Sequence, residues 1–266
     1  VDEFSMVDML LCDKLFRQLG NRAHVLLIGD AHQLPSVGPG LVLREIIASG
    51  AVPATCLDTV FRQAGGSRIA QNAQRIIAGE TRLDYGMPDF VFLPASSDEE
   101  AANIMKEQYL QQAALSSVDD VKILTPMRER GCISAKSMNA LMRELVNPKR
   151  PQKAELKHSG QVYRVGDKVM QLKNMDDINN GDIGMIQSIQ KDDDGRLCAT
   201  VLFSENRQHV YAGQEMGMLT LAYALTIHKS QGSEFDTAII PVTKSLWIML
   251  RRELYYTAIT RARKKV

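Results

Sequence analysis

The chain has 266 residues, of which 45% are hydrophobic and 24% charged, a composition typical of a globular protein of one to three domains. No apolar run approaches the roughly eighteen residues of a membrane helix, and no signal-peptide pattern is visible, so we expect a cytoplasmic protein. The formal net charge of +1 excludes a strongly basic nucleic-acid coat. This net charge is compatible with a local groove that binds nucleic acid, because single-stranded nucleic acids are also held by stacking and a few backbone contacts.

The first sixty residues alternate between strand-like and helix-like patterns, as α/β folds do. Residues 1–3 have the character of the carboxyl end of a strand, and Ser5 is expected to cap a helix that stops at Gly20. Residues 24–28 form a continuous apolar run, which favours a strand buried on both faces. A further helix is expected to end at Gly50.

The same alternation continues after residue 66. Ser67 is expected to cap one helix, and Ser97-x-x-Glu100 has the pattern of a capping box that opens another. Residues 121–124 are typical of a strand. The next helix is expected to end at Asn147-Pro148, because proline disfavours helical backbone in the residue before it.

From about residue 161 to residue 211 the pattern changes to short β-like segments with turn signals at Asn180-Gly181 and Asp194-Gly195. We expect a small antiparallel barrel from segments 162–171, 184–190, 197–203 and 208–211. A strand at 237–242 and a helix from about 251 to 263 follow. The fold class is therefore α/β with an all-β insert.

Asp2 and Glu3 form an acidic pair at a predicted strand end. Such a pair can hold hydrated Mg²⁺ through Asp2, while Glu3 polarises an attacking water. The alternative is that both residues simply precede a helix, near its positive end. The dipeptide alone favours this second interpretation, because dipeptides recur by chance.

The segment Gly29-Asp-Ala-His-Gln-Leu-Pro35 is more informative. It follows the neighbouring strand, so Gln33 is expected beside the acidic pair, at the sheet edge where ligands bind in α/β folds. A Gln side chain both donates and accepts, which suits a group that senses a phosphate or a water. The alternative is a polar loop stiffened by prolines.

The last forty-odd residues hold Thr226-Ile-His-Lys-Ser-Gln-Gly232 and Tyr256-Thr-Ala-Ile-Thr-Arg-Ala-Arg263. Hydroxyl, imidazole and ammonium groups on a glycine-bearing turn can hold a phosphate or a polynucleotide backbone, and a helical arginine can reach a transferring phosphoryl group. The Gly-x-x-x-x-Gly-Lys-[Ser/Thr] phosphate loop is absent from the sequence.

These segments and Phe61-Arg-Gln63, in this order, resemble superfamily 1 DNA helicases, most closely the RecD/TraA group. The resemblance implies two RecA-like lobes of the P-loop NTPase type, with a phosphate loop upstream of the acidic pair. We therefore expect a carboxyl-terminal fragment. The expected domains are the end of the first lobe (1–60), the second lobe (61–150 and 217–266) and an SH3-like insert (151–216).

The resemblance also implies roles in catalysis. Asp2 would reach Mg²⁺, Glu3 would activate water, and Gln33 would link the γ-phosphate to the DNA-facing side. Arg62 and Arg261 would meet the γ-phosphate, because a guanidinium is permanently charged and bidentate for phosphate. The alternative for either arginine is an ordinary ion pair.

Residues implied in DNA contact fall in three places. His228, Lys229 and Ser230 would lie at a strand-to-helix turn against the DNA backbone. Gly232 would let the main chain turn closely, and Glu234 would connect this turn to the nucleotide.

Thr125 and Arg128 lie in a segment that resembles another single-strand contact of the family, although a short buried turn is an open alternative. In the insert, Lys168, Lys173 and Asn174 are candidates for backbone contacts. A plain barrel surface is equally consistent with these three residues.

The sequence thus predicts part of an ATP-dependent DNA helicase or translocase that moves 5′ to 3′ on single-stranded DNA in recombination or repair. ATP and Mg²⁺ are the expected cofactors, and recombination or repair subunits are possible partners. Without a phosphate loop, we expect the chain alone to lack ATPase activity. A non-catalytic nucleic-acid-binding scaffold is the alternative, and a nuclease is weakly supported because the carboxylates form no second metal cluster.

Overall fold

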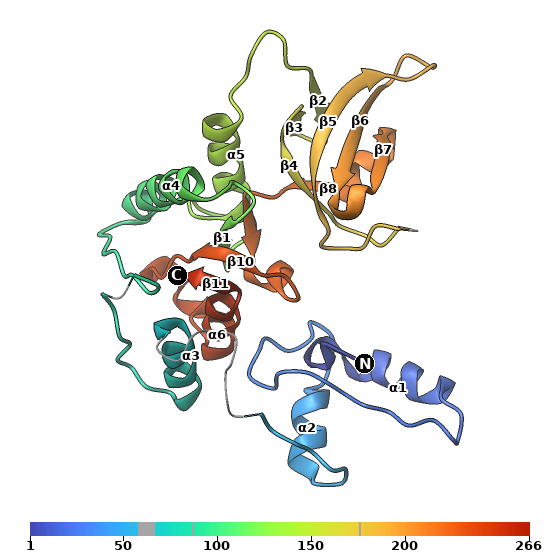
Figure 1. Ribbon diagram of the computed structural model, residues 1–266, viewed down its shortest axis with the longest axis vertical. Coiled ribbons are helices and arrows are strands. Elements are labelled where there is room, and N and C mark those ends of the chain that lie inside the picture. The colour runs from blue at the N-terminus through green and yellow to red at the C-terminus, as the bar shows by residue number, and fades with distance from the viewer. Residues whose placement is uncertain (58–66, 87, 176) are drawn as a thin grey trace. The chain divides into compact units, whose positions relative to one another are not determined.

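A computed structural model describes residues 1–57, 67–86, 88–175 and 177–266 (Figure 1). The chain divides into two compact units, one formed by Val1–Phe92 with Trp247–Val266 and the other by Leu93–Leu246. No helix in the described part of the chain is long and apolar enough to cross a membrane.

The first unit is built from short helices. They are η1 (Phe4–Met6), α1 (Met9–Gln18), α2 (Val42–Ser49), α3 (Arg68–Ala78) and α6 (Arg252–Thr260), and they are followed by strand β11 (Ala262–Lys265). Helix α2 ends at Gly50 and Ser67 caps α3, as predicted, and α3 ends at Gly79; both glycines have a left-handed backbone. The last helix ends earlier than predicted, so Arg263 lies in β11.

Ser5 does not cap α1, which corrects the prediction. Glu3 has a left-handed backbone (φ 50°), and the chain then forms the 3₁₀ turn η1, which contains Ser5. Because this turn comes first, α1 begins only at Met9. Asp8 caps α1 by accepting a hydrogen bond at 2.7 Å from the amide of Leu11.

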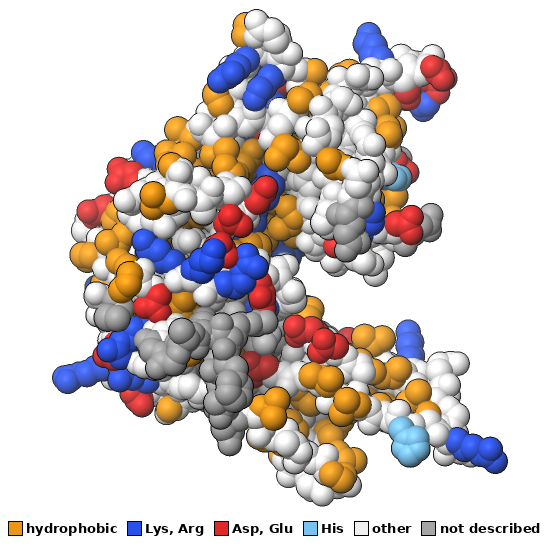
Figure 2. Space-filling view, in the orientation of Figure 1, with side chains coloured by type: hydrophobic (Ala, Val, Ile, Leu, Met, Phe, Trp, Pro, Cys, Tyr) orange, Lys and Arg blue, Asp and Glu red, His pale blue; other side chains and the backbone are white. Residues whose placement is uncertain are grey.

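The predicted strand at residues 24–28 is present only as backbone pairing with the start of the chain. The amino group of Val1 donates to the Leu26 carbonyl at 2.8 Å, and the Ile28 amide donates to the Val1 carbonyl at 2.9 Å. The prediction that this strand is buried on both faces was wrong, because Leu26 is 70% exposed. Figure 2 shows hydrophobic side chains at the surface of this amino-terminal segment.

The second unit begins with a parallel sheet. Its elements are α4 (Asp98–Leu115), β1 (Val121–Thr125), α5 (Ala135–Val146), β9 (Ala224–Thr226), η4 (Ile227–Ser230) and β10 (Phe235–Ile239). Strand β1 lies between β9 and β10 and is buried along its whole length. This arrangement confirms the predicted α/β class.

The all-β insert is also confirmed. Strands β2 (Glu155–His158) and β3 (Gln161–Arg164) form a hairpin. A five-stranded antiparallel sheet, in the order β7-β6-β5-β4-β8, is formed by β4 (Lys168–Gln171), β5 (Ile183–Lys191), β6 (Leu197–Phe203), β7 (Gln208–Ala212) and β8 (Leu219–Leu221). Two 3₁₀ turns, η2 (Ser204–Asn206) and η3 (Gly213–Met218), flank β7, while η5 (Lys244–Met249) follows β10.

The segment predicted as one strand, 162–171, is divided into β3 and β4 by a tight turn. Gly166 has a left-handed backbone (φ 87°). Asp167 is fully buried, and its Oδ2 accepts a hydrogen bond at 2.7 Å from the Arg164 amide. A short carboxylate that binds the backbone three residues earlier stabilises this turn.

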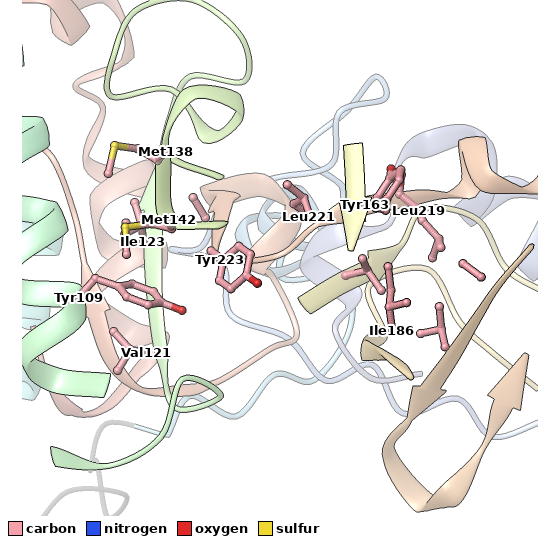
Figure 3. Packing of buried hydrophobic residues seen from close by; sticks show 14 of the residues in the cluster. Tyr109, Val121, Ile123, Met138, Met142, Tyr163, Ile186, Leu219, Leu221 and Tyr223 are labelled. Atoms are coloured by element: carbon pink, nitrogen blue, oxygen red, sulfur yellow. The ribbon is translucent and has the colours of Figure 1, made fainter. Parts of the chain in front are cut away.

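Within the second unit, the parallel sheet and the insert share one hydrophobic core (Figure 3). Val121 of the sheet, Ile186 of the insert and Tyr223 between them belong to the same buried cluster. The amide of Asn139 on α5 donates to the Ala224 carbonyl, and its oxygen accepts from the Tyr223 and Ala224 amides. The insert is therefore packed against the lobe that carries it.

Candidate nucleotide and nucleic-acid sites

The acidic pair and the loop after residue 28 lie at the same end of the paired segments of the first unit. The Phe4 amide donates to the Ile28 carbonyl at 2.8 Å. Gly29 lies so close to this backbone that an added Cβ would be 2.9 Å from the Ser5 nitrogen. The segment thus requires glycine here, because any side chain would collide with the chain that follows Asp2 and Glu3.

The carboxylate of Asp2 accepts a hydrogen bond from the Glu3 amide at 2.8 Å. Mg²⁺ is commonly held by one or two carboxylates together with waters and substrate phosphates, and the exposed Asp2 fits that mode of binding. No group of three metal-ligating side chains occurs among residues 1–57, 67–86, 88–175 and 177–266.

Asp30 connects the predicted Gln33 loop to α6. Its Oδ1 accepts from the His32 amide at 2.9 Å, and its Oδ2 accepts from Gln33 Nε2 at 3.3 Å and from the Tyr256 hydroxyl at 2.7 Å. Burial and the hydrogen bond to Asp30 raise the pKa of Tyr256, so this hydroxyl stays protonated and donates at neutral pH.

A second contact joins the same two segments. The Leu34 amide donates to Thr257 Oγ1 at 2.8 Å, and the Thr257 hydroxyl donates to the Glu253 carbonyl at 2.8 Å. Arg44 Nη2 lies 3.0 Å from the Ala31 carbonyl and 3.9 Å from the Glu253 carboxylate. The loop is therefore held against α6 by hydrogen bonds and charge.

Arg261 lies at the carboxyl end of this helix. Its side chain is buried, and Nε donates to the Thr257 carbonyl at 3.2 Å. Since Thr257 also binds Leu34, one residue contacts both Arg261 and the loop of Gln33. The other predicted arginine, Arg62, lies outside the described residues.

A separate cavity of about 260 Å³ lies within the second unit. It is lined by residues of β9, η3, η4, the start of α5 and the β2–β3 hairpin. Its charged and titratable lining residues are Arg128, Glu129, Lys136, His158 and Lys229. The three basic side chains outnumber the single carboxylate, so the cavity favours a polyanion.

Arg128 and Lys229 are the predicted DNA contacts that line this cavity. The Arg128 side chain is 76% exposed, with Nε 3.5 Å from the Glu129 carboxylate, and Lys229 is also exposed. Partial burial and the nearby Arg128 charge lower the pKa of Lys229. Arg128 and Lys229 carry like charges and line the same cavity. A bound anion would therefore reduce the repulsion between them.

Two of the other predicted contact residues, Ser230 in this turn and Thr125 at the end of β1, have internal hydrogen bonds. Ser230 is fully buried and its hydroxyl donates to the Ile227 carbonyl at 2.8 Å, while the buried Thr125 Oγ1 accepts from the Met127 amide at 3.4 Å. Burial lowers the pKa of His228, so its ring is neutral at pH 7. The expected α-helix after β9 is the 3₁₀ turn η4. These side chains therefore shape the turn.

The proposed contact of Lys168 needs correction. Its side chain is 5% exposed, and Nζ lies 2.6 Å from Asp119 Oδ1 and 3.1 Å from the Val118 carbonyl. The ammonium is engaged inside the unit because β4 packs against the segment before β1. Asn174 is exposed but organises its own loop, since its Oδ1 accepts from the Asn180 amide at 2.8 Å.

Gly232 and Glu234 follow η4. Gly232 has a left-handed backbone (φ 74°), which is the conformation that the predicted close turn requires. Glu234 is half-buried. Its predicted link to the nucleotide stays a prediction.

Sequence reasoning missed several contributors to these sites. Asp30, Tyr256 and Thr257 lie inside the quoted motifs, but only the fold reveals that they connect the Gln33 loop to α6. Lys136 and His158 line the cavity from α5 and β2. Neither lies in a motif, so no local pattern could identify them.

Three family models match the chain. "AAA domain" matches residues 1–88, "ATP-dependent RecD-like DNA helicase SH3 domain" matches residues 138–203, and "UvrD-like helicase C-terminal domain" matches residues 221–266. The second match covers β2 to β6, which are strands assigned above to the insert.

Curated relatives match the chain over its whole length. The ATP-dependent RecD2 DNA helicase of Deinococcus radiodurans is 34% identical over 267 residues, which cover 100% of this chain and 35% of the relative. The RecBCD enzyme subunit RecD of Mycobacterium tuberculosis is 28% identical over 287 residues, which cover 100% of this chain and 48% of the relative. The chain thus spans less than half of these relatives' length.

Solved structures share the fold. The Pif1 helicase from Bacteroides in complex with ADP-AlF3 and ssDNA aligns with a TM-score of 0.59 at 20% identity, over 99% of this chain and 67% of that one. The Pif1 helicase from Candida albicans aligns with a TM-score of 0.59 at 19% identity, over 99% and 69%. Together with the matched models and relatives, the motifs and the insert lead to one conclusion: the chain belongs to the RecD-like superfamily 1 DNA helicases.

Proposed function

We propose that the full-length protein that carries this sequence is an ATP-dependent helicase that moves 5′ to 3′ on single-stranded DNA in recombination or repair. The observation that carries the proposal is the contact between the Gln33 loop and the helix of Arg261. Asp30 and Tyr256, which are 226 residues apart in the sequence, bring the two segments together, as a site that binds one ligand from two sides requires.

The proposed chemistry divides among the residues of this site. ATP would supply the phosphoryl group, and Mg²⁺ held by Asp2 would neutralise charge on it. Glu3 would accept the proton of the attacking water, and Gln33 would contact the water or the γ-phosphate. Arg261, with Arg62, would stabilise charge that develops on the γ-phosphoryl oxygens.

This chain would contribute only part of that site. The phosphate loop is absent from its sequence, and backbone amides of such a loop are what normally cradle the phosphates. We therefore propose that the chain alone does not hydrolyse ATP. Partner subunits belong to the same proposal, since one curated relative is named as a subunit of the RecBCD enzyme. We also propose a cytoplasmic location for the full-length protein.

We propose the cavity of the second unit as the place where single-stranded DNA binds. Arg128, Lys136 and Lys229 offer positive charge around one cavity, and such contacts act on the sugar-phosphate backbone rather than on bases. Binding should consequently depend strongly on salt and weakly on sequence. The Bacteroides Pif1 helicase, which shares the fold, has been solved in complex with single-stranded DNA.

Lys229→Ala tests the nucleic-acid part of the proposal. We expect weaker binding of a fluorescent oligo-dT and a decrease of about 0.7 in the magnitude of the slope of log K against log salt, because one phosphate contact is lost. Fluorescence anisotropy over a series of salt concentrations measures both. Lys191→Ala is the matched control, since Lys191 is exposed at the end of β5 and does not line the cavity. Equal slopes for the two variants would contradict the assignment.

A non-catalytic nucleic-acid-binding module is the second candidate, for the chain taken alone. The specific observation in its favour is that the cationic cavity lies wholly within the second unit, so it does not depend on the nucleotide site.

A further inference from the structure

We infer that Asp30 and Tyr256 form a latch that fixes the amide orientation of Gln33 and ties it to the helix of Arg261. This inference rests on the proposed function, because Gln33 and Arg261 are its proposed phosphate-site residues. Both latch residues are positioning residues, since they act through Gln33.

The latch is a chain of two hydrogen bonds through one carboxylate oxygen. The Tyr256 hydroxyl donates to Asp30 Oδ2 at 2.7 Å, and Gln33 Nε2 donates to the same oxygen at 3.3 Å. The other oxygen, Oδ1, accepts from the His32 amide. The edge of the His32 ring also lies against Tyr256, with centroids 6.3 Å apart.

The carboxylate determines which end of the Gln33 amide faces it. An ionised carboxylate only accepts hydrogen bonds, so the nitrogen of Gln33, and not its oxygen, must point toward Asp30. The opposite orientation would place two oxygens against each other. Asp30 thereby directs Oε1 of Gln33 away from itself.

The Oε1 atom of Gln33 gives a second observation that points to a ligand. Gln33 Oε1 is buried and accepts no hydrogen bond from the described residues. A buried acceptor without a donor destabilises the folded state, and native structures rarely retain one without a reason. A water or another donor bound at the phosphate site would satisfy it.

Tyr256 makes this orientation depend on α6. Its hydroxyl holds Asp30 from the helix whose end carries Arg261, and the Leu34 amide is held by Thr257 one residue further on. If α6 shifts away, Asp30 loses the Tyr256 donor and keeps only those of His32 and Gln33, so its carboxylate and the Gln33 amide are held less firmly. The latch would therefore couple the acceptor on Gln33 to the presence of the arginine.

Tyr256→Phe removes the hydroxyl alone and is the test. In the full-length protein we expect kcat for ATP hydrolysis to fall roughly tenfold or more, as loss of a hydrogen bond to a charged group implies, with KM changed less than about twofold. Tyr85→Phe is the control, because it removes a hydroxyl from an exposed residue of the same unit and leaves the Asp30 bond in place. Equal kcat in both variants would overturn the inference.

A double-mutant cycle separates positioning from a general loss of structure. If Tyr256 acts through Gln33, Tyr256→Phe should lower kcat roughly tenfold in the parent protein but less than about twofold in a Gln33→Ala background. Additive losses would mean that Tyr256 does not act through Gln33, and would refute the latch.

Hydrogen exchange gives a readout that does not need activity. In the protein without nucleotide, Tyr256→Phe should raise the exchange rate of the amides of residues 31–34 several-fold, while amides of β5 and β6 keep their rates. Unchanged exchange in residues 31–34 would refute the latch even if the protein proved inactive. A protein with the expected exchange but no ATPase activity would instead refute the proposed function.

Discussion

Arg261→Ala is expected to lower kcat for DNA-stimulated ATP hydrolysis of the full-length protein by about 10³-fold or more, the loss typical of an arginine that stabilises phosphoryl transfer. Steady-state phosphate release measures this loss. The substitution removes a planar, permanently charged donor whose Nε is held by the Thr257 carbonyl at 3.2 Å. The developing charge on the γ-phosphoryl group then has no counterpart from α6.

Two controls make this result specific. Arg261→Lys keeps the charge but loses the planar fork, so it should restore only part of the rate. Because Arg261 is buried, thermal unfolding must show that each variant is folded. A folded Arg261→Ala protein with kcat close to that of the parent would contradict the role of Arg261.

Arg164→Met is expected to destabilise the second unit by about 1.5–3 kcal/mol, because a buried side chain loses its hydrogen bonds to two carboxylates and a carbonyl. The Arg164 side chain is 6% exposed and binds the carboxylates of Glu155 at 2.5 Å and Glu144 at 2.9 Å, and the Asn147 carbonyl at 3.1 Å. These bonds join β3 to α5. Urea unfolding of the chain, followed by circular dichroism, measures the change.

Arg196→Met is the matched control for this substitution. Its side chain is 64% exposed and pairs with Asp192 and Asp194 in a surface turn, so the cost should be at most about 1 kcal/mol. Equal destabilisation by the two substitutions would show that the buried network does not stabilise the unit.

The same network predicts an acid dependence. Hydrogen bonds from Arg164 are the main cause that lowers the pKa of both Glu144 and Glu155 from 4.5. A carboxyl whose folded pKa is lowered stabilises the protein above its unfolded pKa, and this stability is lost as pH falls through the folded value. The parent chain should therefore lose more stability than Arg164→Met when the pH falls below about 4.5.

Local patterns predicted most elements of the fold because their signals are short-range. Ser67, Ser97 and Gly50 mark helix ends through their own backbone conformation and hydrogen bonds, and all three do so in the structure. Ser5 failed as a cap because the left-handed Glu3 and the turn η1 come from contacts with residue 28, which no local pattern contains.

The site was predictable to the level of motifs but not of contacts. The sequence indicated that Gln33 and Arg261 belong together, yet only tertiary structure brings Asp30 against Tyr256. Lys168 was misjudged for the converse reason. The resemblance of the insert suggested a contact with the DNA backbone, whereas packing of β4 buries Lys168 beside Asp119.

The most direct measurement of the central claim is the ATPase rate of this chain and of the full-length protein, each with and without single-stranded DNA. We predict no hydrolysis by the chain, and DNA-stimulated hydrolysis by the full-length protein that Glu3→Gln abolishes. Hydrolysis by the full-length protein at the same rate before and after that substitution would contradict the account, as would a folded full-length protein that hydrolyses no ATP in the presence of DNA.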